Sequence, residues 1–357
     1  MRIPFELEES IVPYRTWRAP IGLKRVRQYI VMAAQETVLY ECPDIQRPDM
    51  TNIYGSPANI QTFKDALKER YKDKKLTVYG KKRIIMTPKR GIIVHSLDPV
   101  FRELTPEEQA VANYNVPFAA ILVQKWGYGF YHFVNEMLPK ILRIKEYNAK
   151  IPIIIFYNDT FVKNILSTLG VTNPIIPYDG STRFTVRSAI LMTETASGNP
   201  TPDDIEVIRR SIKAPPTPPI RDTIVLIYRR EAQRSISNFE ELYAGLKRRF
   251  PKEKFAIFGS GVPFDATIQL FQSAKLVIGA HGAGLSNMIW GAKGTPVIEI
   301  FPAMMVNACY WHLAWIMENP HYTLAAKSSG HPLLNIAVDL SELSTVIMKA
   351  LSIPIID

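Results

Sequence analysis

The sequence predicts an α/β fold built from two Rossmann-like halves. In both halves, short apolar runs rich in β-branched residues alternate with amphipathic helical stretches, the pattern of parallel sheets covered by helices. A proline-rich segment, 214–219, separates the halves, and it can continue neither a helix nor a central strand. We therefore expect a first domain over 1–214, a second over 215–340, and a terminal helix within 341–357 that packs back on the first.

Composition narrows the class of protein and of partner. A chain of 357 residues is long enough for two domains, and 47% hydrophobic residues fit a globular protein with substantial cores. The net charge of +10 predicts an anionic partner, such as nucleotide phosphates or an anionic membrane surface. The two cysteines have no metal-ligand spacing and form no disulfide framework. Without a signal-peptide pattern or a long apolar stretch, we expect a cytoplasmic protein.

In the first half, strands and helices alternate after an irregular start. The predicted helices cover 58–69, 131–142 and 160–169, and the predicted strands cover 84–86, 91–95, 116–123, 151–157, 173–177 and 184–192. Pro139 predicts a kink near Leu138 in the middle helix. The charged runs at 71–75 and 81–83 predict a solvated face, with contact to an anionic membrane surface as the alternative.

The second half repeats the rhythm. We predict strands at 223–228, 255–258, 276–278 and 296–302, and helices at 239–250, 267–274 and 341–351. Asn238 is positioned to cap the first of these helices, and the acidic residues that follow it suit a helix start.

A glycine-rich loop at 279–284 joins a buried strand to a predicted helix start, which favours an anion site. His281 supplies a side-chain donor, and the expected backbone N–H donors belong to Gly282, Ala283, Gly284 and Leu285. The spacing of the glycines fits neither a dinucleotide fingerprint nor a Walker loop. The alternative is a turn whose glycines only pack the helix against the strand.

Further candidate residues lie at the predicted ends of strands, where open α/β sheets bind ligands. Three arginines with guanidinium forks suited to phosphate follow the strand 223–228: Arg229, Arg230 and Arg234. Glu299, predicted at the end of its strand, is placed to accept hydrogen bonds from a ribose. The alternative is that the arginines are surface charges.

The first half offers an acid/base pair and a set of aromatic residues. His132 and Glu136 are four residues apart, so one helix face presents both. The alternative is a histidine satisfied in the core beside a solvated glutamate. Three aromatic residues alternate with glycines near the loop 124–131, as at the mouth of a pocket, or are plain core and rim residues: Trp126, Tyr128 and Tyr131.

Taken in order, these segments resemble the signature of glycosyltransferase family 61. The resemblance runs from about 115 to 325 and rests on His132-Phe133 with Glu136 and Leu138-Pro139, on 226–230 with Arg234, and on 279–288, 296–300 and 310–314. It implies a GT-B fold, in which two Rossmann-like domains face a central cleft and the C-terminal domain holds most of the donor. It also implies inverting, metal-independent transfer from a UDP-sugar.

Under this resemblance we expect transfer of a pentose such as xylose, or of GlcNAc, to a glycan or glycoprotein. Glu136 or His132 would act as the base, and the aromatic residues Trp126, Tyr128 and Tyr131 would stack on an acceptor sugar. No metal or other cofactor is expected; the chain accordingly lacks an Asp-x-Asp run. The alternative function is that of a non-catalytic protein that binds a nucleotide or a polyanion. We expect no nucleic-acid partner, because no nucleic-acid motif accompanies the basic run at 72–83.

Overall fold

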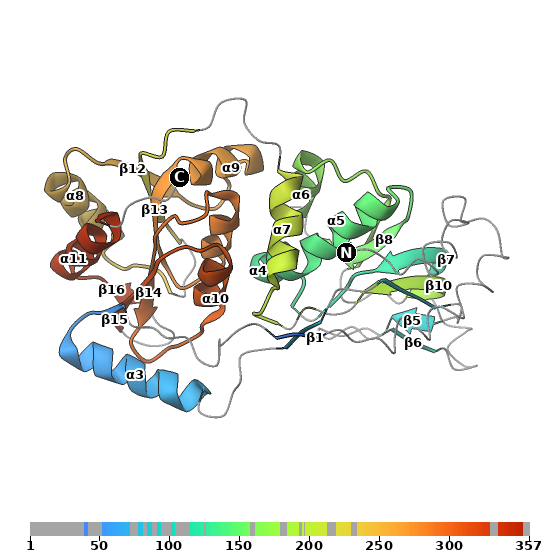
Figure 1. Cartoon of the computed structure of the whole chain (residues 1–357), viewed down its shortest axis with the longest axis horizontal. Coiled ribbons are helices and arrows are strands. Elements are labelled where there is room, and N and C mark those ends of the chain that lie inside the picture. The colour runs from blue at the N-terminus through green and yellow to red at the C-terminus, as the bar shows by residue number, and fades with distance from the viewer. Residues whose placement is uncertain are drawn as a thin grey trace. The chain divides into compact units, whose positions relative to one another are not determined.

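The structure is a computed structural model of the chain. It describes residues 39–41, 52–71, 78–80, 84–87, 91–93, 101–103, 114–124, 126–157, 161–178, 184–192, 195, 197–212, 219–229, 234–328 and 335–352. Two compact units form, unit 1 from 1–43 and 77–211 and unit 2 from 44–76 and 212–357 (Figure 1). The predicted boundary at 214/215 lies three residues from the observed one. However, 44–76 was predicted in the first domain and belongs to unit 2, since strand β2 (Ile53–Tyr54) pairs with that unit's sheet.

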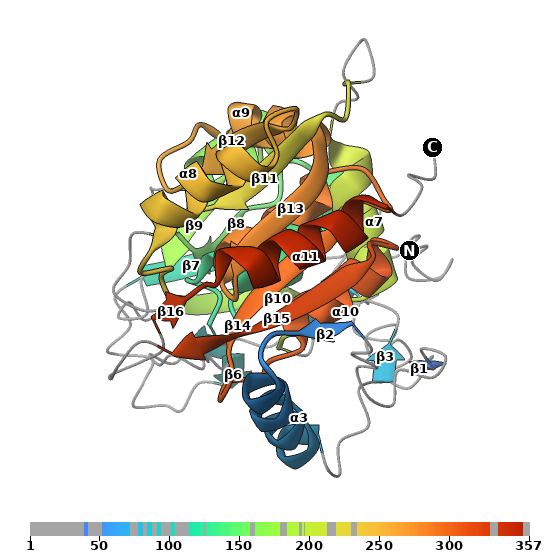
Figure 2. The same ribbon diagram turned by 90° about the vertical axis from the view of Figure 1, so that its left-hand side faces the viewer.

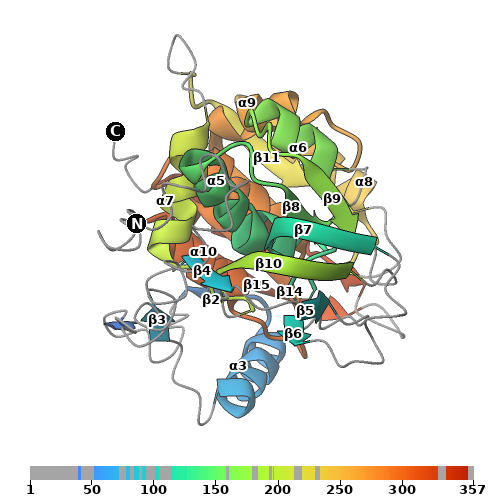
Figure 3. The same cartoon turned by 90° about the vertical axis from the view of Figure 1, so that its right-hand side faces the viewer.

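Unit 1 contains a seven-stranded mixed sheet with the order β6-β5-β10-β7-β8-β9, and β4 also pairs with β10 (Figure 3). The strands are β4 (Ile84–Thr87), β5 (Gly91–Ile93), β6 (Phe101–Glu103), β7 (Tyr114–Ile121), β8 (Ile153–Phe156), β9 (Ile175–Tyr178) and β10 (Phe184–Met192). The four from β7 to β10 pair in parallel. A separate antiparallel pair joins β1 (Leu39–Glu41) and β3 (Val78–Gly80). Parallel pairing confirms the α/β fold class for this half.

The helices of unit 1 follow the parallel strands. They are α4 (Phe130–His132), the π-helix η3 (Phe133–Met137), α5 (Leu138–Tyr147), α6 (Val162–Thr168) and α7 (Pro202–Ser211). The kink predicted near Leu138 takes the form of the π-helical turn, which ends at Met137, and Pro139 lies in the first turn of α5. Short π-helical turns are frequent at functional sites.

Unit 2 contains a second seven-stranded sheet, with the order β12-β11-β13-β14-β15-β16 and with β2 on β15. Its other strands are β11 (Thr223–Ile227), β12 (Lys254–Phe258), β13 (Ala274–Ala280), β14 (Val297–Pro302), β15 (His321–Ser328) and β16 (Ile336–Ala337). From β11 to β15 every pairing is parallel. The chain places β12 on one side of β11 and β13 on the other, so the strand order reverses between β11 and β13. Ligands of open α/β sheets bind at such a reversal.

Helices cover both faces of the sheet of unit 2. They are α3 (Pro57–Tyr71), α8 (Phe239–Arg249), α9 (Phe264–Gln272), the 3₁₀-helix η4 (Ala283–Trp290), α10 (Cys309–Ile316) and α11 (Leu340–Leu351). On one face, Ile278, Ile298 and Leu324 pack with residues of α8 and α11. On the other face, Phe301 and Ala325 pack against Phe63 of α3.

The terminal helix α11 lies across β13, β14 and β15, as Figure 2 shows. Its buried residues, among them Leu343 and Ile347, belong to the core of unit 2. The apolar face of this helix therefore packs on the second unit, and the predicted contact with the first domain stays a prediction. An apolar pattern of helical period identifies a helix that buries one face, but it does not identify the partner. In the part of the chain that the structure describes, no helix combines the length and the apolar character that crossing a membrane requires.

Candidate functional site

The reversal of strand order in unit 2 brings Arg229 and the glycine-rich loop together. Arg229 follows β11 and His281 follows β13, and these strands are neighbours. A side chain at position 282 would collide with the guanidinium of Arg229, so Gly282 is required for this close approach. A Cβ at Gly279 or Gly284 would lie 3.1 Å or 2.7 Å from atoms of Ile227. Close packing of the loop against β11 thus explains why Gly279 and Gly284 are glycines, as the alternative interpretation expected. Gly282, in contrast, leaves room for the guanidinium of Arg229.

The loop itself departs from the prediction in two details. The segment after it, predicted as a helix start, is the 3₁₀-helix η4. The backbone N–H of Leu285 donates to the carbonyl of Gly282 at 3.0 Å, so this amide is engaged within the loop and is not available as predicted. Ala283 and Gly284 begin the 3₁₀-helix.

A chain of three buried side chains lies behind the loop. His281 Nδ1 is 2.5 Å from Glu299 Oε1, and His321 Nε2 is 2.8 Å from Glu299 Oε2. Glu299 has no exposed surface. The prediction placed Glu299 at the end of its strand, but β14 continues to Pro302 and Glu299 is in mid-strand. With both oxygens facing histidines, the carboxyl group is not positioned for a ribose.

Burial determines the charges of the Glu299, His281 and His321 side chains. It raises the pKa of the Glu299 carboxyl well above its usual range. It lowers the pKa of His321 to about 3, and it also lowers the pKa of His281 to about 3, where the positive charges of Arg234 and Arg229 add to the effect. Both imidazoles are therefore neutral at physiological pH, and the positive charge beside the loop comes from arginine side chains.

Arg234 lies in a strained part of this site. Its φ of +58° falls in the left-handed region, which is unfavourable for any residue with a side chain and is found most often at functional sites. Its charge, like that of Arg229, acts on the buried phenol of Tyr310 as well as on His281. Arg230, the third predicted arginine, lies outside the described residues.

In unit 1, the predicted acid/base pair forms the centre of a buried hydrogen-bond network. Glu136 Oε2 accepts from Gln124 Nε2 at 2.5 Å and faces His132 Nδ1 at 3.0 Å, while Glu136 Oε1 accepts from the backbone N–H of Gly198 at 2.8 Å. Lys140 Nζ donates to Gln124 Oε1 at 2.5 Å. Glu136 has no exposed surface, but the side chain of His132 is 24% exposed. The network holds the carboxylate still and leaves the imidazole accessible.

The predicted aromatic residues separate into two exposed and one buried. Trp126 and Tyr128 are 38% and 42% exposed, with ring centroids 6.2 Å apart in an edge-on arrangement. Trp126 has a left-handed φ of +65°, and Gly127 leaves no room for a side chain beside Met137. Tyr131 is buried and packs edge-on against His132, so the prediction that it stacks on a sugar is not supported by its position.

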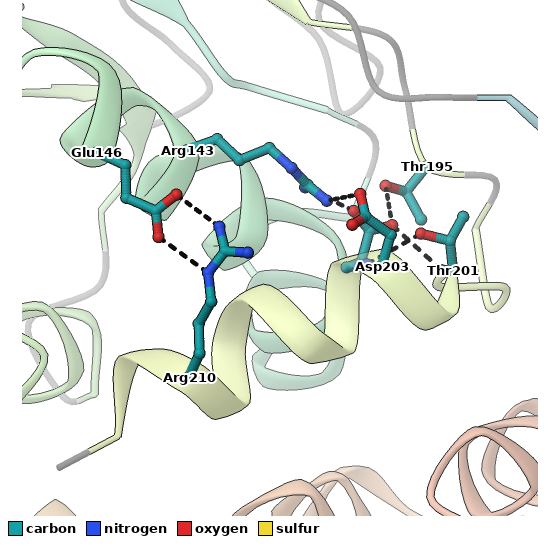
Figure 4. Close-up of polar contacts among 7 residues, drawn as sticks. Arg143, Glu146, Thr195, Thr201, Asp203 and Arg210 are labelled. Atoms are coloured by element: carbon teal, nitrogen blue, oxygen red, sulfur yellow. Dashed lines mark hydrogen bonds and ion pairs between the residues drawn. The ribbon is translucent and has the colours of Figure 1, made fainter. Parts of the chain in front are cut away.

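The adjacent acidic residues Asp203 and Asp204 have a structural role. Arg143 of α5 donates to Asp204 Oδ1 at 2.7 Å and to Asp203 Oδ2 at 2.6 Å, as Figure 4 shows. Asp204 is buried and also accepts from the backbone N–H of Thr201, at the first turn of α7. These carboxylates are therefore engaged in tying α7 to α5. The described residues contain no group of three or more His, Cys, Asp or Glu side chains arranged to hold a metal ion.

Three residues of these networks were not predicted as site residues: Gln124, Lys140 and His321. Gln124 lies three residues after the end of β7, so its place beyond the end of a parallel strand was a usable signal. Lys140 is one helical turn beyond Glu136, which places both on one helix face. His321 opens a strand, and nothing local in the sequence marks it.

Comparison with known proteins identifies the family. The model of the family described as glycosyltransferase 61 matches residues 130–298, a range that includes His132, Glu136, Arg229 and His281. This segment of the chain is similar to glycosyltransferase family 61. This confirms the resemblance found in the sequence.

An 84-residue segment of the chain is also 26% identical to a protein from Canis lupus familiaris, protein O-linked-mannose beta-1,4-N-acetylglucosaminyltransferase 2. The aligned segment covers 24% of the chain and 14% of the relative, so the chain matches only a small part of that protein's length.

Proposed function

We propose that this protein is a glycosyltransferase related to family 61, and that it transfers a sugar from a UDP-sugar to a glycan or glycoprotein, with inversion and without a metal ion. In this proposal the two units are the two Rossmann-like domains of a GT-B enzyme. The donor sugar is a pentose such as xylose, or GlcNAc, and the name of the canine relative favours GlcNAc. The family match supports glycosyl transfer, and the features below support the finer assignments.

The donor diphosphate is assigned to the loop after β13 in unit 2. Arg229 lies against Gly282, and the charges of Arg229 and Arg234 both act on His281, so the positive charge gathers where the strand order reverses. Guanidinium groups form strong, directional hydrogen bonds to phosphate oxygens. As the bond from the sugar to the diphosphate breaks, fixed cations would stabilise the negative charge that develops on the leaving group. This is the role that a divalent cation fills in metal-dependent transferases.

The general base is assigned to His132, with Glu136 as its positioning partner. The observation that carries this assignment is that three donors surround the Glu136 carboxylate, which is buried, while His132 is partly exposed. A neutral His132 that donates Nδ1–H to Glu136 has its lone pair on Nε2. That nitrogen would take the proton of the acceptor hydroxyl as the hydroxyl oxygen attacks the anomeric carbon.

The acceptor is assigned to the exposed aromatic pair beside this network. Trp126 and Tyr128 lie two and four residues after Gln124, which donates to Glu136. The left-handed backbone at Trp126 costs energy, and such strain persists where the surrounding structure holds a residue for a function. Stacking of a sugar ring on exposed aromatic faces would place an acceptor hydroxyl near His132.

The decisive experiment offers a panel of nucleotide sugars with candidate acceptors to the whole chain and detects transfer or hydrolysis by mass spectrometry. We expect turnover with a UDP-sugar, with equal rates with and without EDTA. His132→Ala and Glu136→Gln should lower kcat by about 10²- to 10⁴-fold, the usual contribution of acid–base catalysis, while UDP affinity is retained. Glu146→Gln, the same change at an exposed glutamate in unit 1, should leave kcat unchanged.

Retained turnover in both His132→Ala and Glu136→Gln would remove this pair from the mechanism. UDP binding without turnover of any nucleotide sugar would instead support the alternative of a non-catalytic binder. Three expectations stay predictions: contact with an anionic membrane surface, a cytoplasmic location and the lack of a nucleic-acid partner. The membrane contact depends on the charged runs at 71–75 and 81–83, which lie outside the described residues apart from Tyr71.

A further inference from the structure

The buried chain His321–Glu299–His281 follows from the register of three neighbouring strands. Val297 of β14 pairs with Val277 of β13 and with His321 of β15, and Glu299 pairs with Gly279. Because side chains alternate between the faces of a strand, His281, Glu299 and His321 all point to the same face of the sheet. His281 lies at the C-terminal edge, Glu299 one step further into the sheet, and His321 one step beyond that. The three side chains therefore form a diagonal line from the ligand-binding edge to the N-terminal start of β15.

Neighbouring aromatic rings fix the plane of His281. Its ring stacks on Phe301 with centroids 4.9 Å apart and meets Tyr310 edge-on at 5.1 Å. Nδ1 is engaged by Glu299, so Nε2 is the ring nitrogen through which His281 can reach a ligand. What His281 offers an anion depends on where one proton lies. If the proton is on Nε2, the ring donates a hydrogen bond to the anion, but if it is on Nδ1, Nε2 presents a lone pair that repels the anion.

The tautomer of His321 is linked to that of His281 through Glu299. When Nε2 of His321 carries the proton, it donates to Glu299 Oε2, which makes that oxygen the accepting one. A fully buried carboxyl group favours its neutral form, and its proton then lies on Oε1, directed at His281 Nδ1. All three groups are neutral in this arrangement, and each short contact has one donor and one acceptor. His281 is left with its proton on Nε2.

We propose that His321 is a positioning residue for donor binding, which acts through Glu299 to hold His281 as the Nε2–H tautomer facing the donor diphosphate. This inference rests on the donor site assigned above. Neither Glu299 nor His321 lies within residues 130–298, the range of the family match. The inference replaces the ribose contact predicted for Glu299 with a role in orienting the histidine of the glycine-rich loop.

Two variants of His321 separate positioning from packing. His321→Leu removes the donor, and UDP affinity measured by calorimetry should fall about tenfold or more, because a hydrogen bond to a charged group is lost. His321→Gln keeps an N–H₂ donor and should recover most of that affinity. Equal UDP affinity in the wild type and in a folded His321→Leu variant would overturn the proposal, and so would equal losses in both variants.

A spectroscopic measurement keeps the proposal testable even if His321→Leu fails to fold. ¹⁵N NMR of the histidine-labelled whole chain reports the tautomer of each ring, with assignment by His281→Gln. We expect Nε2–H for His281 in the wild type and in His321→Gln, and an Nδ1–H tautomer in wild-type His281 would overturn the proposal. Failure of UDP to bind the wild type would count against the donor site, while the NMR result would still decide the tautomer.

Discussion

The buried ion pair between Arg143 and Asp204 gives a sharp prediction for the stability of unit 1. Arg143→Met keeps an apolar stem of similar length but leaves the carboxylate of Asp204, which has no exposed surface, without its guanidinium partner. An uncompensated buried charge costs about 3–5 kcal/mol. The remaining hydrogen bonds to Asp204, from Thr195 and from the amide of Thr201, place the expected loss near the lower value.

A matched control lies on the same two helices. Arg210 of α7 pairs with Glu146 of α5 at 2.6 Å, but both side chains are more than 40% exposed (Figure 4). Exposed ion pairs contribute about 0–1 kcal/mol, so Arg210→Met should have little effect. The two variants therefore remove the same chemical group from the same helix pair and differ in burial.

Hydrogen exchange measured by mass spectrometry is the appropriate assay, because it reports on each unit separately. In Arg143→Met, the slowest amides of α5 and α7 should exchange about 100-fold faster or more, as a loss of about 3 kcal/mol requires. Amides of β13 and β14 in unit 2 should keep their rates. Equal acceleration in Arg143→Met and Arg210→Met would refute the reasoning that burial of Asp204 sets the magnitude.

Three further predictions concern unit 2 and the proposed reaction. Between about pH 4.5 and 6.5, His281 and His321 are protonated in the unfolded chain but not in the folded unit, whereas Glu299 is protonated only in the folded unit. The unfolded chain therefore binds about one proton more than the folded unit in this range. Acidification should thus lower the free energy of unfolding by about 1.4 kcal/mol per pH unit, and His321→Gln should remove that slope in urea titrations. Phe63→Ala should cost about 3–5 kcal/mol and expose α3 to proteolysis, unlike Lys64→Ala at an exposed site. EDTA should leave turnover unchanged, and restoration of a lost rate by added Mg²⁺ would contradict this.

Local patterns in the sequence predicted most of the regular structure. The apolar runs over 223–227 and 297–302 are buried strands, and the glycine-rich loop joins a strand to a short helix. His132 and Glu136 meet as their spacing predicted, since a contact four residues apart depends only on helix geometry. The kink at Pro139 was also visible locally, although not its π-helical form.

Features that depend on long-range pairing were not predictable in this way. The contact of His321 with Glu299 requires the register of β14 against β15, and one residue of slip would turn His321 to the other face. Segment 44–76 joins unit 2 through the pairing of β2 with β15, some 270 residues later in the chain. The burial of Tyr131 likewise depends on packing that a single helix pattern does not specify.

The central claim is that the arginines and the loop after β13 hold the leaving diphosphate without a metal ion. A crystal structure of the chain grown with UDP in the presence of EDTA tests it most directly. The account predicts phosphate oxygens within hydrogen-bond distance of the guanidinium of Arg229 and of His281 Nε2. A nucleotide bound away from β11 and β13, or a diphosphate that binds only when a divalent cation is supplied, would contradict it.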